Sequence, residues 1–464
     1  MLKKNNKKIN KLINQALISK QEGNLIDAEK CLKKALKIDP ENFIALNNIG
    51  NISSIRNKAK EAQNYFSRAI NIKQDYSNAI FNLALVNEEL GNKKKAIKLY
   101  KEAIKHDQEN LGFYHNLSRI DETFFNNENI EIIKKILTNE KISYFNKSCG
   151  FFILANNQKK KENFKEEFEH LIEAHNFFHF SDEKINNQVS FYWIRLIPKV
   201  FEKFDLTFQK NLSKGVKPIF ITGLPRSGST LIESIISSGK RIIPNGGETG
   251  IINRVFLEES KEFFSKKEFL DDNKKLKIDE ISFVQKTLDH YQLFNLLDRS
   301  KSGIFTDKSL ENFFFIELII KMFPEAKIIN CERNILQIII SIYQNFLPNI
   351  KWSHSIDNIL EYIDNYLKII KGFKEKYPDK IFTVKLEDFI ADNENLSKDL
   401  FRFCDLEWDF KCLEFYKRDD LFSKTASNQQ IRNKIFNNDK KNYLNYMEFL
   451  RPYATKYEWL KELL

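Results

Sequence analysis

The chain has 464 residues, a net charge of +11 and a hydrophobic content of 42%. This length allows two to four domains with sizeable cores, and the hydrophobic content excludes a mainly disordered chain. The positive charge is spread along the sequence, which favours an anionic ligand and does not call for nucleic acid.

The cysteines and the apolar segments indicate the compartment. The cysteines are odd in number and far apart, which predicts free thiols in a reducing compartment, the cytoplasm, rather than disulfides or a zinc site. The basic start has no apolar segment after it, so we expect no signal peptide. The most apolar run, 313–320, is too short to span a membrane and indicates a buried helix. The cysteines are Cys31, Cys149, Cys331, Cys404 and Cys412.

The N-terminal part is repetitive, with a period of 34 over residues 9–110. Each repeat has a small residue, then a Leu or aromatic residue, then a second small residue at fixed offsets. A residue that tolerates a left-handed backbone stands near the middle of each repeat. These positions are Ala28, Leu32 and Ala35; Ala62, Phe66 and Ala69; Ala96, Tyr100 and Ala103; and Gly23, Asn57 and Gly91.

This pattern resembles the tetratricopeptide repeat (TPR), which implies antiparallel helix pairs stacked into a solenoid. The concave surface of such solenoids usually holds a peptide or protein segment, which is therefore the expected partner. A spacer or an oligomerisation arm is the alternative interpretation. The next segment, 111–212, is predicted to continue as helices, with a degenerate repeat at 152–178 that carries Leu171 and Ala174 at the repeat offsets.

Histidines in the degenerate repeat raise the question of a metal. His175 and His179 are spaced i, i+4, which places two imidazoles on one helix face. No third ligand is indicated and the repeat already explains the helix, so we expect no metal.

A strand, a glycine-rich loop and a helix follow from residue 215 onward. The loop 223–230, Gly-Leu-Pro-Arg-Ser-Gly-Ser-Thr, has the spacing of the nucleotide phosphate loop, but Ser229 replaces its lysine. Backbone N–H groups and the helix N-terminus still favour an anion, and Arg226 adds a charged donor. The loop therefore predicts binding of one anionic group, such as a 5′-phosphate, rather than a triphosphate with magnesium.

From residue 215 to the end the chain resembles the sulfotransferases that use 3′-phosphoadenosine 5′-phosphosulfate, and among them most closely the protein-tyrosine sulfotransferases. The motifs that carry the resemblance stand in the expected order. They are PRSGST (225–230), GGET (246–249), TDK (306–308), KIINCERNILQIIIS (327–341) and TASNQQIR (425–432).

The resemblance implies a role for each motif. The 5′-phosphosulfate would bind Arg226, Ser227, Gly228, Ser229 and Thr230; the 3′-phosphate would bind Arg333 and Ser341; and Ser427, with Gln430 and Arg432 as helpers, would close over the nucleotide. Glu248 would take the proton of the acceptor hydroxyl, and Lys308 would stabilise the leaving group. Arg254 would contact an acidic acceptor or pair with Glu248. The reaction would need no metal.

One departure affects the turn after Arg333, where many relatives have an Asp-Pro-like pair and this chain has Asn334-Ile335. Each assignment also has a plain structural alternative. Arg333 could form a surface ion pair, and Lys308 could be a surface lysine. Glu248, in a loop after a strand-like 241–243, could be a loop glutamate that caps a helix from Thr249 onward.

The sequence therefore predicts an α plus α/β chain: three TPR repeats over 1–110, a helical continuation over 111–212, and a sulfotransferase domain over 213–464. This domain has a parallel sheet with strands near 217–222, 327–331 and 381–385 and helices on both faces. The acceptor, a tyrosine, carbohydrate, lipid or small phenol, stays open. The competing functions are a P-loop kinase of a small molecule and a TPR scaffold with an inactive domain.

Overall fold

The computed structural model describes residues 2–21, 23–205, 212–271, 273–298, 303–418, 420–421, 424, 428, 430–435 and 442–464. The chain divides into two compact units, one built mainly from residues up to 157 and the other mainly from 158–418. The boundaries expected at 110/111 and 212/213 stay predictions. Among the described residues, no helix is both long and apolar enough to cross a membrane.

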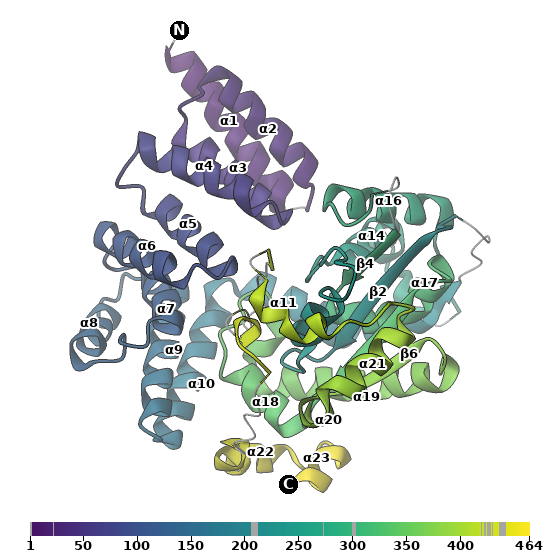
Figure 1. The fold of residues 1–464 in the computed structure, drawn as a ribbon. Coiled ribbons are helices and arrows are strands. Elements are labelled where there is room, and N and C mark those ends of the chain that lie inside the picture. The colour runs from purple at the N-terminus through teal and green to yellow at the C-terminus, as the bar shows by residue number, and fades with distance from the viewer. Residues whose placement is uncertain are drawn as a thin grey trace. The chain divides into compact units, whose positions relative to one another are not determined.

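The first unit begins with three helix pairs, as the 34-residue period predicts (Figure 1). The small and aromatic residues at the repeat offsets are all buried, because small side chains let the paired helices approach and the larger one fills the space beside them. The residues at the turns within the pairs, Gly23, Asn57 and Gly91, have φ of 81°, 60° and 83°, in the left-handed region. The helices are α1 (Leu2–Gln21), α2 (Leu25–Ile38), α3 (Phe43–Ile55), α4 (Ala59–Ile72), α5 (Ser77–Glu89) and α6 (Lys93–His106).

The chain continues as helices, as expected. Leu171 and Ala174, at the repeat offsets, are buried. A short π-helical segment, Tyr192–Leu196, interrupts the last helices. The helices are α7 (Leu111–Ile120), α8 (Asn127–Leu137), α9 (Tyr144–Lys160), α10 (Phe164–Ser181), α11 (Glu183–Phe191) and α12 (Ile197–Val200).

The second unit contains a four-stranded parallel sheet in the order β4-β2-β5-β6. The three strands expected from the sequence are present, and the sheet has a fourth, β4. The prediction of helices before a parallel α/β sheet is confirmed. The strands are β2 (Val216–Gly223), β4 (Gly303–Asp307), β5 (Lys327–Glu332) and β6 (Ile381–Lys385), and a separate two-residue parallel pair joins β1 (Phe204–Asp205) to β3 (Leu276–Lys277).

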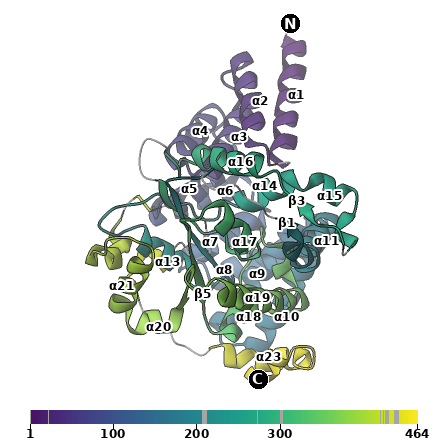
Figure 2. The same ribbon diagram turned by 90° about the vertical axis from the view of Figure 1, so that its right-hand side faces the viewer.

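Helices cover both faces of the sheet (Figure 2). Helices α13 and α21 pack together on one side, and α17 and α19 lie on the other. This arrangement follows from the strand order, because β2 connects to β4 on one side and the chain then crosses to β5, and right-handed crossovers in opposite directions place helices on opposite faces. The helices are α13 (Ser229–Ile236), α14 (Ile251–Glu259), α15 (Lys261–Ser265), α16 (Glu280–Leu293), α17 (Ile316–Met322), α18 (Ile335–Tyr343), α19 (Ile356–Lys376), α20 (Leu386–Ala391), α21 (Asn393–Phe403), α22 (Met447–Leu450) and α23 (Glu458–Leu463).

The cysteines are all free, and only Cys31 is partly exposed. Burial raises the pKa of the Cys331 thiol to about 12 and that of Cys412 to about 11. Burial also raises the pKa of the Cys149 and Cys404 thiols. These four thiols therefore behave as small apolar groups of the core.

Candidate active site

The candidate site lies at the carboxyl edge of the sheet, where β2 ends beside β4 and β5. Strand β2 leads into the loop 224–228, β4 into Lys308 and β5 into Arg333. Because the connection after β2 leads to β4 on one side and the connection after β5 leads to β6 on the other, this edge is the switch point at which parallel sheets open a crevice for ligands. The topology thus explains why three motifs that are far apart in the sequence belong to one region.

Backbone conformation in the phosphate loop requires glycine at two positions. Gly223 has φ of 140°, and a Cβ there would lie 2.5 Å from the carbonyl oxygen of Cys331 on β5. Gly228, the N-cap of α13, has φ of 89°, and a Cβ there would lie 2.7 Å from Cδ1 of Leu386. Arg226 also has a positive φ, 72°. The loop is therefore tightly curled between its neighbours, as a loop that converges N–H groups on an anion must be.

The hydroxyl groups of this loop are held close to the start of α13. Ser227, Ser229 and Thr230 are buried. The Oγ atom of Ser227 has no hydrogen-bond partner, although it is completely shielded from solvent. A buried hydroxyl without a partner costs stability, and an anionic ligand would satisfy it.

The two groups predicted for the cofactor's phosphates come together. Nε of Arg226 donates to Oγ of Ser341 at 3.0 Å, and Nη1 of Arg333 donates to the backbone oxygen of Arg226 at 3.1 Å. Nε of Arg333 also donates to Oε1 of Gln337 at 3.0 Å. All three site residues are partly exposed. Arg333 thus braces the phosphate loop through the Arg226 backbone.

Asn334, at the departure from the family pattern, forms the N-cap of α18. Its side chain accepts a hydrogen bond from N of Gln337 at 3.0 Å, and its own N donates to Oε1 of Glu387 at 2.9 Å. Asn is as good a cap as Asp, so the helix that carries Ser341 begins at the same place that a capping Asp would give it. Despite this departure, α18 has a capped N-terminus, with Arg333 directly before the cap and Ser341 within the helix.

Lys308 and Glu248 form an ion pair, with Nζ and Oε1 2.7 Å apart. The Lys308 side chain is 1% exposed, so it is not a surface lysine, while Glu248 is 48% exposed. Burial lowers the pKa of Lys308, but Glu248 and Glu233 more than compensate, so the pKa is raised and the amine stays charged. A buried cation beside a half-exposed carboxylate is the arrangement that general acid–base and electrostatic catalysis require.

The loop that carries Glu248 is attached to the end of β4. N of Lys308 donates to the Gly247 oxygen at 2.9 Å, and N of Thr306 donates to the Pro244 oxygen at 3.0 Å. A Cβ at Gly246 would lie 2.1 Å from the Thr306 oxygen, so glycine is needed for this approach. The expectation of a strand-like 241–243 is wrong, because this segment forms only an isolated bridge between Ser238 and Ile242. The hydrogen bonds to the end of β4 come from the residues that follow it, Pro244 and Gly247.

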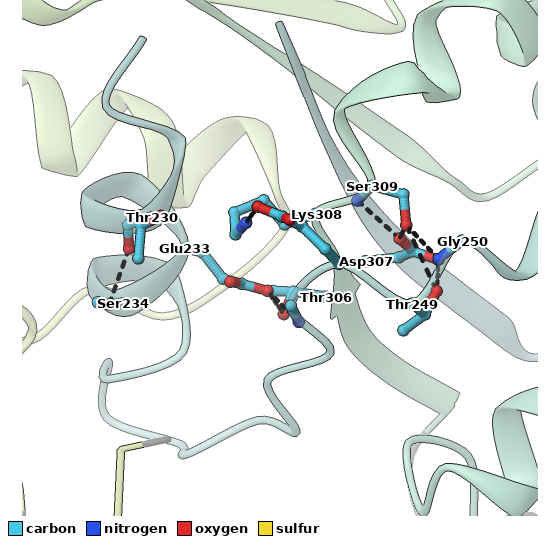
Figure 3. A network of polar contacts seen from close by, with 11 residues as sticks. Thr230, Glu233, Ser234, Thr249, Gly250, Thr306, Asp307, Lys308 and Ser309 are labelled. Atoms are coloured by element: carbon cyan, nitrogen blue, oxygen red, sulfur yellow. Dashed lines mark hydrogen bonds and ion pairs between the residues drawn. The ribbon is translucent and has the colours of Figure 1, made fainter. Parts of the chain in front are cut away.

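A buried carboxylate that the sequence does not single out, Glu233, ties α13 to this loop (Figure 3). Its Oε1 accepts from Oγ1 of Thr306 at 2.8 Å and from N of Gly247 at 2.9 Å. Burial raises the pKa of Glu233. It lies one turn after Thr230, so it couples the phosphate loop to the Lys308 segment.

Asp307 fixes the other side of the same segment (Figure 3). Oδ2 accepts from Oγ1 of Thr249 at 2.9 Å and from the Tyr291 hydroxyl at 2.8 Å. Oδ1 accepts from Oγ of Ser309 at 2.7 Å. The Ser309 Oγ in turn accepts from N of Gly250 at 2.8 Å. The residues next to Lys308 and Glu248 in the chain are therefore held in place by hydrogen bonds.

A second carboxylate near the ion pair, Glu311, is also absent from the sequence assignment. Burial raises its pKa to about 7, and the charges of Glu248 and Asp307 act in the same direction. Burial and the charge of Glu311 raise the pKa of the Tyr192 and Tyr362 hydroxyls. These two tyrosines therefore lie near Glu311. Nothing in the apolar run that follows Glu311 marks it as functional; only the neighbouring TDK motif is a signal.

The late loop is described only in part. Ser427 lies outside the described residues, and for Gln430 only the backbone is described. Nη2 of Arg432 lies 3.5 Å from Oδ1 of Asn428. Burial lowers the pKa of the Arg254 guanidinium, and the charge of Glu258 opposes this shift.

The histidines of the degenerate repeat have other partners. Nδ1 of His175 lies 2.9 Å from Nδ1 of His354, and Nε2 of His175 lies 2.9 Å from the Tyr343 oxygen. His179 lies near Glu183. Within the described ranges, no three His, Cys, Asp or Glu residues gather as metal ligands.

Comparison with known proteins identifies the class of each part. Residues 218–410 match the model of the sulfotransferase family, and residues 12–42 and 77–110 match tetratricopeptide-repeat models. The chain thus carries tetratricopeptide repeats followed by a sulfotransferase-family domain, as the motifs predict.

Individual relatives are distant. An uncharacterized protein of Aquifex aeolicus is 26% identical over 341 residues, which cover 70% of this chain and 43% of that protein, so the chain spans less than half of the relative's length. The sulfotransferase domain of the Synechococcus PCC 7002 olefin synthase is 18% identical over 50% of this chain and 88% of its own, with a TM-score of 0.35. The sulfotransferase STF1 of Mycobacterium tuberculosis is 12% identical over 67% of this chain and 92% of its own, with a TM-score of 0.29.

Proposed function

We propose that this protein transfers a sulfuryl group from 3′-phosphoadenosine 5′-phosphosulfate to an acceptor hydroxyl. The observation that carries the proposal is the convergence at one sheet edge of a curled, lysine-free phosphate loop, the Arg226–Ser341–Arg333 contacts and the Lys308–Glu248 ion pair. Loop 223–230 would hold the 5′-phosphosulfate, with Ser227 Oγ gaining its missing partner. Arg333 and Ser341 would bind the 3′-phosphate, and Ser427 and Arg432 would cover the nucleotide.

The chemistry follows from the charges. The acceptor oxygen forms a bond to sulfur while the bond from sulfur to the bridging oxygen of the 5′-phosphate breaks. Glu248 takes the acceptor proton, and Lys308 stabilises the negative charge that develops on the bridging oxygen. Adenosine 3′,5′-bisphosphate leaves. The charge of Glu233 also raises the pKa of the buried Lys308 amine, and this contribution would remain when Glu248 becomes neutral.

A phenol is the acceptor best suited to this site. A carboxylate is too weak a base to deprotonate a sugar alcohol outright, whereas a phenol, with a pKa of about 10, loses its proton more easily. We therefore propose a tyrosine side chain as the acceptor. A P-loop kinase is less well supported, because Ser229 stands where the phosphate-contacting lysine belongs.

The repeats would present the protein that carries the tyrosine. An asparagine recurs at the same place in α3, α5 and α7, namely Asn48, Asn82 and Asn116, each partly exposed. Amides of Asn48 and Asn116 donate to backbone oxygens four residues earlier, which fixes their orientation. An oriented amide both donates and accepts, as a peptide backbone requires of its partner. The free thiols fit a cytoplasmic location.

Purified protein with radiolabelled donor tests the proposal. Release of adenosine 3′,5′-bisphosphate with label on tyrosyl peptides supports it. Release with label only on glycans or lipids corrects the acceptor. If calorimetry shows binding of ATP and no binding of the bisphosphate, the result favours a P-loop kinase. The triple variant N48A/N82A/N116A should lower transfer to a protein acceptor and leave transfer to a small phenol unchanged.

A further inference from the structure

The helix α9, outside every motif of the sulfotransferase domain, ends beside the Arg226–Ser341–Arg333 contacts. Its penultimate residue, Lys159, donates from Nζ to Oε1 of Gln344 at 2.6 Å. Gln344 is the C-cap of α18, three residues after Ser341 on the same helix. Positions three apart on a helix lie on one face, so Lys159 approaches the face from which Ser341 contacts Arg226.

The Lys159 amine is largely buried and has only this neutral amide as a described partner. Burial lowers its pKa, the nearby positive charge of Arg226 adds to this effect, and Glu167 opposes it. The ion pairs of the described residues include none formed by Lys159, whose Nζ donates to the Gln344 amide. A shielded ammonium group next to a guanidinium is unfavourable unless an anion joins them.

Glu167, the carboxylate whose charge favours the Lys159 ammonium, is engaged by other groups. Glu167, on α10 and 1% exposed, accepts from Nε2 of Gln344 at 2.8 Å and from the Tyr446 hydroxyl at 2.6 Å. Both of its oxygens are thus engaged, and burial raises its pKa. Gln344 therefore holds Lys159 in place by its oxygen and Glu167 by its nitrogen, which positions the amine without neutralising it.

We propose that Lys159 is a third cationic contact of the cofactor's 3′-phosphate, together with Arg333 and Ser341. This inference rests on the proposed function. It assigns recognition of the 3′-phosphate partly to the helical region that precedes the sulfotransferase motifs. A dianionic 3′-phosphate held by Arg333 and Lys159 would accept charge-assisted hydrogen bonds from both, and its negative charge would offset the positive charge of Arg226 near Lys159.

Calorimetry on the full chain tests the role with two probes, adenosine 3′,5′-bisphosphate and adenosine 5′-phosphate. Lys159→Gln should weaken binding of the bisphosphate by about 10- to 100-fold and change binding of the 5′-phosphate by less than about twofold. Lys161→Gln, an exposed lysine two residues later, makes the same charge change and should leave both affinities unaltered. Lys159→Arg should restore most of the bisphosphate affinity.

The outcomes separate this inference from the proposed function. Equal loss for both probes, or no loss for either, would overturn the role of Lys159 while wild-type binding still supports the cofactor. A wild-type protein that ignores the bisphosphate overturns both. Lys159→Met, which keeps the apolar stem in the shielded position, replaces Lys159→Gln if the latter does not fold, and the same ratio of affinities decides.

Discussion

Nε of Arg226 lies 3.0 Å from Oγ of Ser341, although the two residues are 115 positions apart in the sequence. This contact joins the loop after β2 to the helix after β5. Both side chains are partly exposed, so a ligand at this edge would meet them together. The proposed cofactor carries phosphates at two ends, and the contact shows that residues assigned to the two ends are neighbours.

Removing the guanidinium of Arg333 should weaken the cofactor product. We expect Arg333→Ala to lower the affinity for adenosine 3′,5′-bisphosphate by about 10- to 100-fold, since hydrogen bonds to charged groups contribute about 1.5–3 kcal/mol. Calorimetry measures this change. Arg402→Ala, which removes an exposed arginine paired with Asp399, is the matched control. Unchanged affinity in Arg333→Ala would contradict the 3′-phosphate assignment.

Substitution of Lys308 should affect turnover more than binding. Lys308→Met removes the cation proposed for the bridging oxygen, and we expect kcat to fall by about 100- to 1,000-fold. The bisphosphate affinity should change little. Lys286→Met serves as control, because Lys286 also lies 2.7 Å from a glutamate but outside the site. A drop in affinity that matches the drop in kcat would assign Lys308 to ground-state binding.

Alanine substitutions at two glycines with positive φ should separate the destabilisation caused by backbone strain from that caused by a steric clash. Gly215 has φ of 79° and open space around its Cβ position, whereas Gly223 would place a Cβ 2.5 Å from the Cys331 oxygen. Gly215→Ala should cost about 1–2 kcal/mol of unfolding free energy from strain alone. Gly223→Ala should cost roughly 3 kcal/mol or more, since β2 and β5 must separate. Urea unfolding gives both values, and equal costs would show that the packing at Gly223 relaxes freely.

Glu311 should make stability depend on pH around neutrality. Its pKa is raised from 4.5 to about 7 in the folded chain, so the folded state binds more protons than the unfolded state between these values. Stability therefore falls as pH rises through this window, by about 3 kcal/mol for this group. Glu311→Gln should remove this decline in urea unfolding at pH 5 and pH 8.

The neighbouring Glu317 provides the opposite control. Burial raises the pKa of Glu317, but its lysine partners outweigh burial and lower it overall. Its contribution to stability is therefore present above the ordinary carboxyl range and lost as pH falls. Glu317→Gln should lower stability at pH 8, whereas Glu311→Gln should raise it. The same direction in both variants would show that Glu311 is not buried as described.

Local patterns explain which features the sequence predicts. The period of 34 determines which residues pair, and Gly23, Asn57 and Gly91 indeed occupy the left-handed turns. The phosphate loop is also recognisable, because its glycines are close together in the chain. The site assignments from motifs stay predictions. The structure does bring Arg226 into contact with Arg333 and Ser341, and it pairs Glu248 with Lys308.

Other features depend on tertiary contacts that leave no local trace. Glu311 stands just before an apolar run, and its pKa is raised by burial that only the folded chain produces. Lys159 stands in a row of three lysines, and nothing in the sequence separates it from Lys161. Glu233 resembles any polar residue of an amphipathic helix until Thr306 and Gly247 meet it.

The unequal exposure of the thiols has a practical consequence. Cys31, in the first repeat, is the one cysteine with access to solvent, while the thiols beside the sheet are shielded and weakly acidic. A maleimide dye would therefore attach to the wild-type chain at a single position, remote in sequence from the phosphate loop. Fluorescence from that dye would follow polypeptide capture by the repeats without any engineered cysteine.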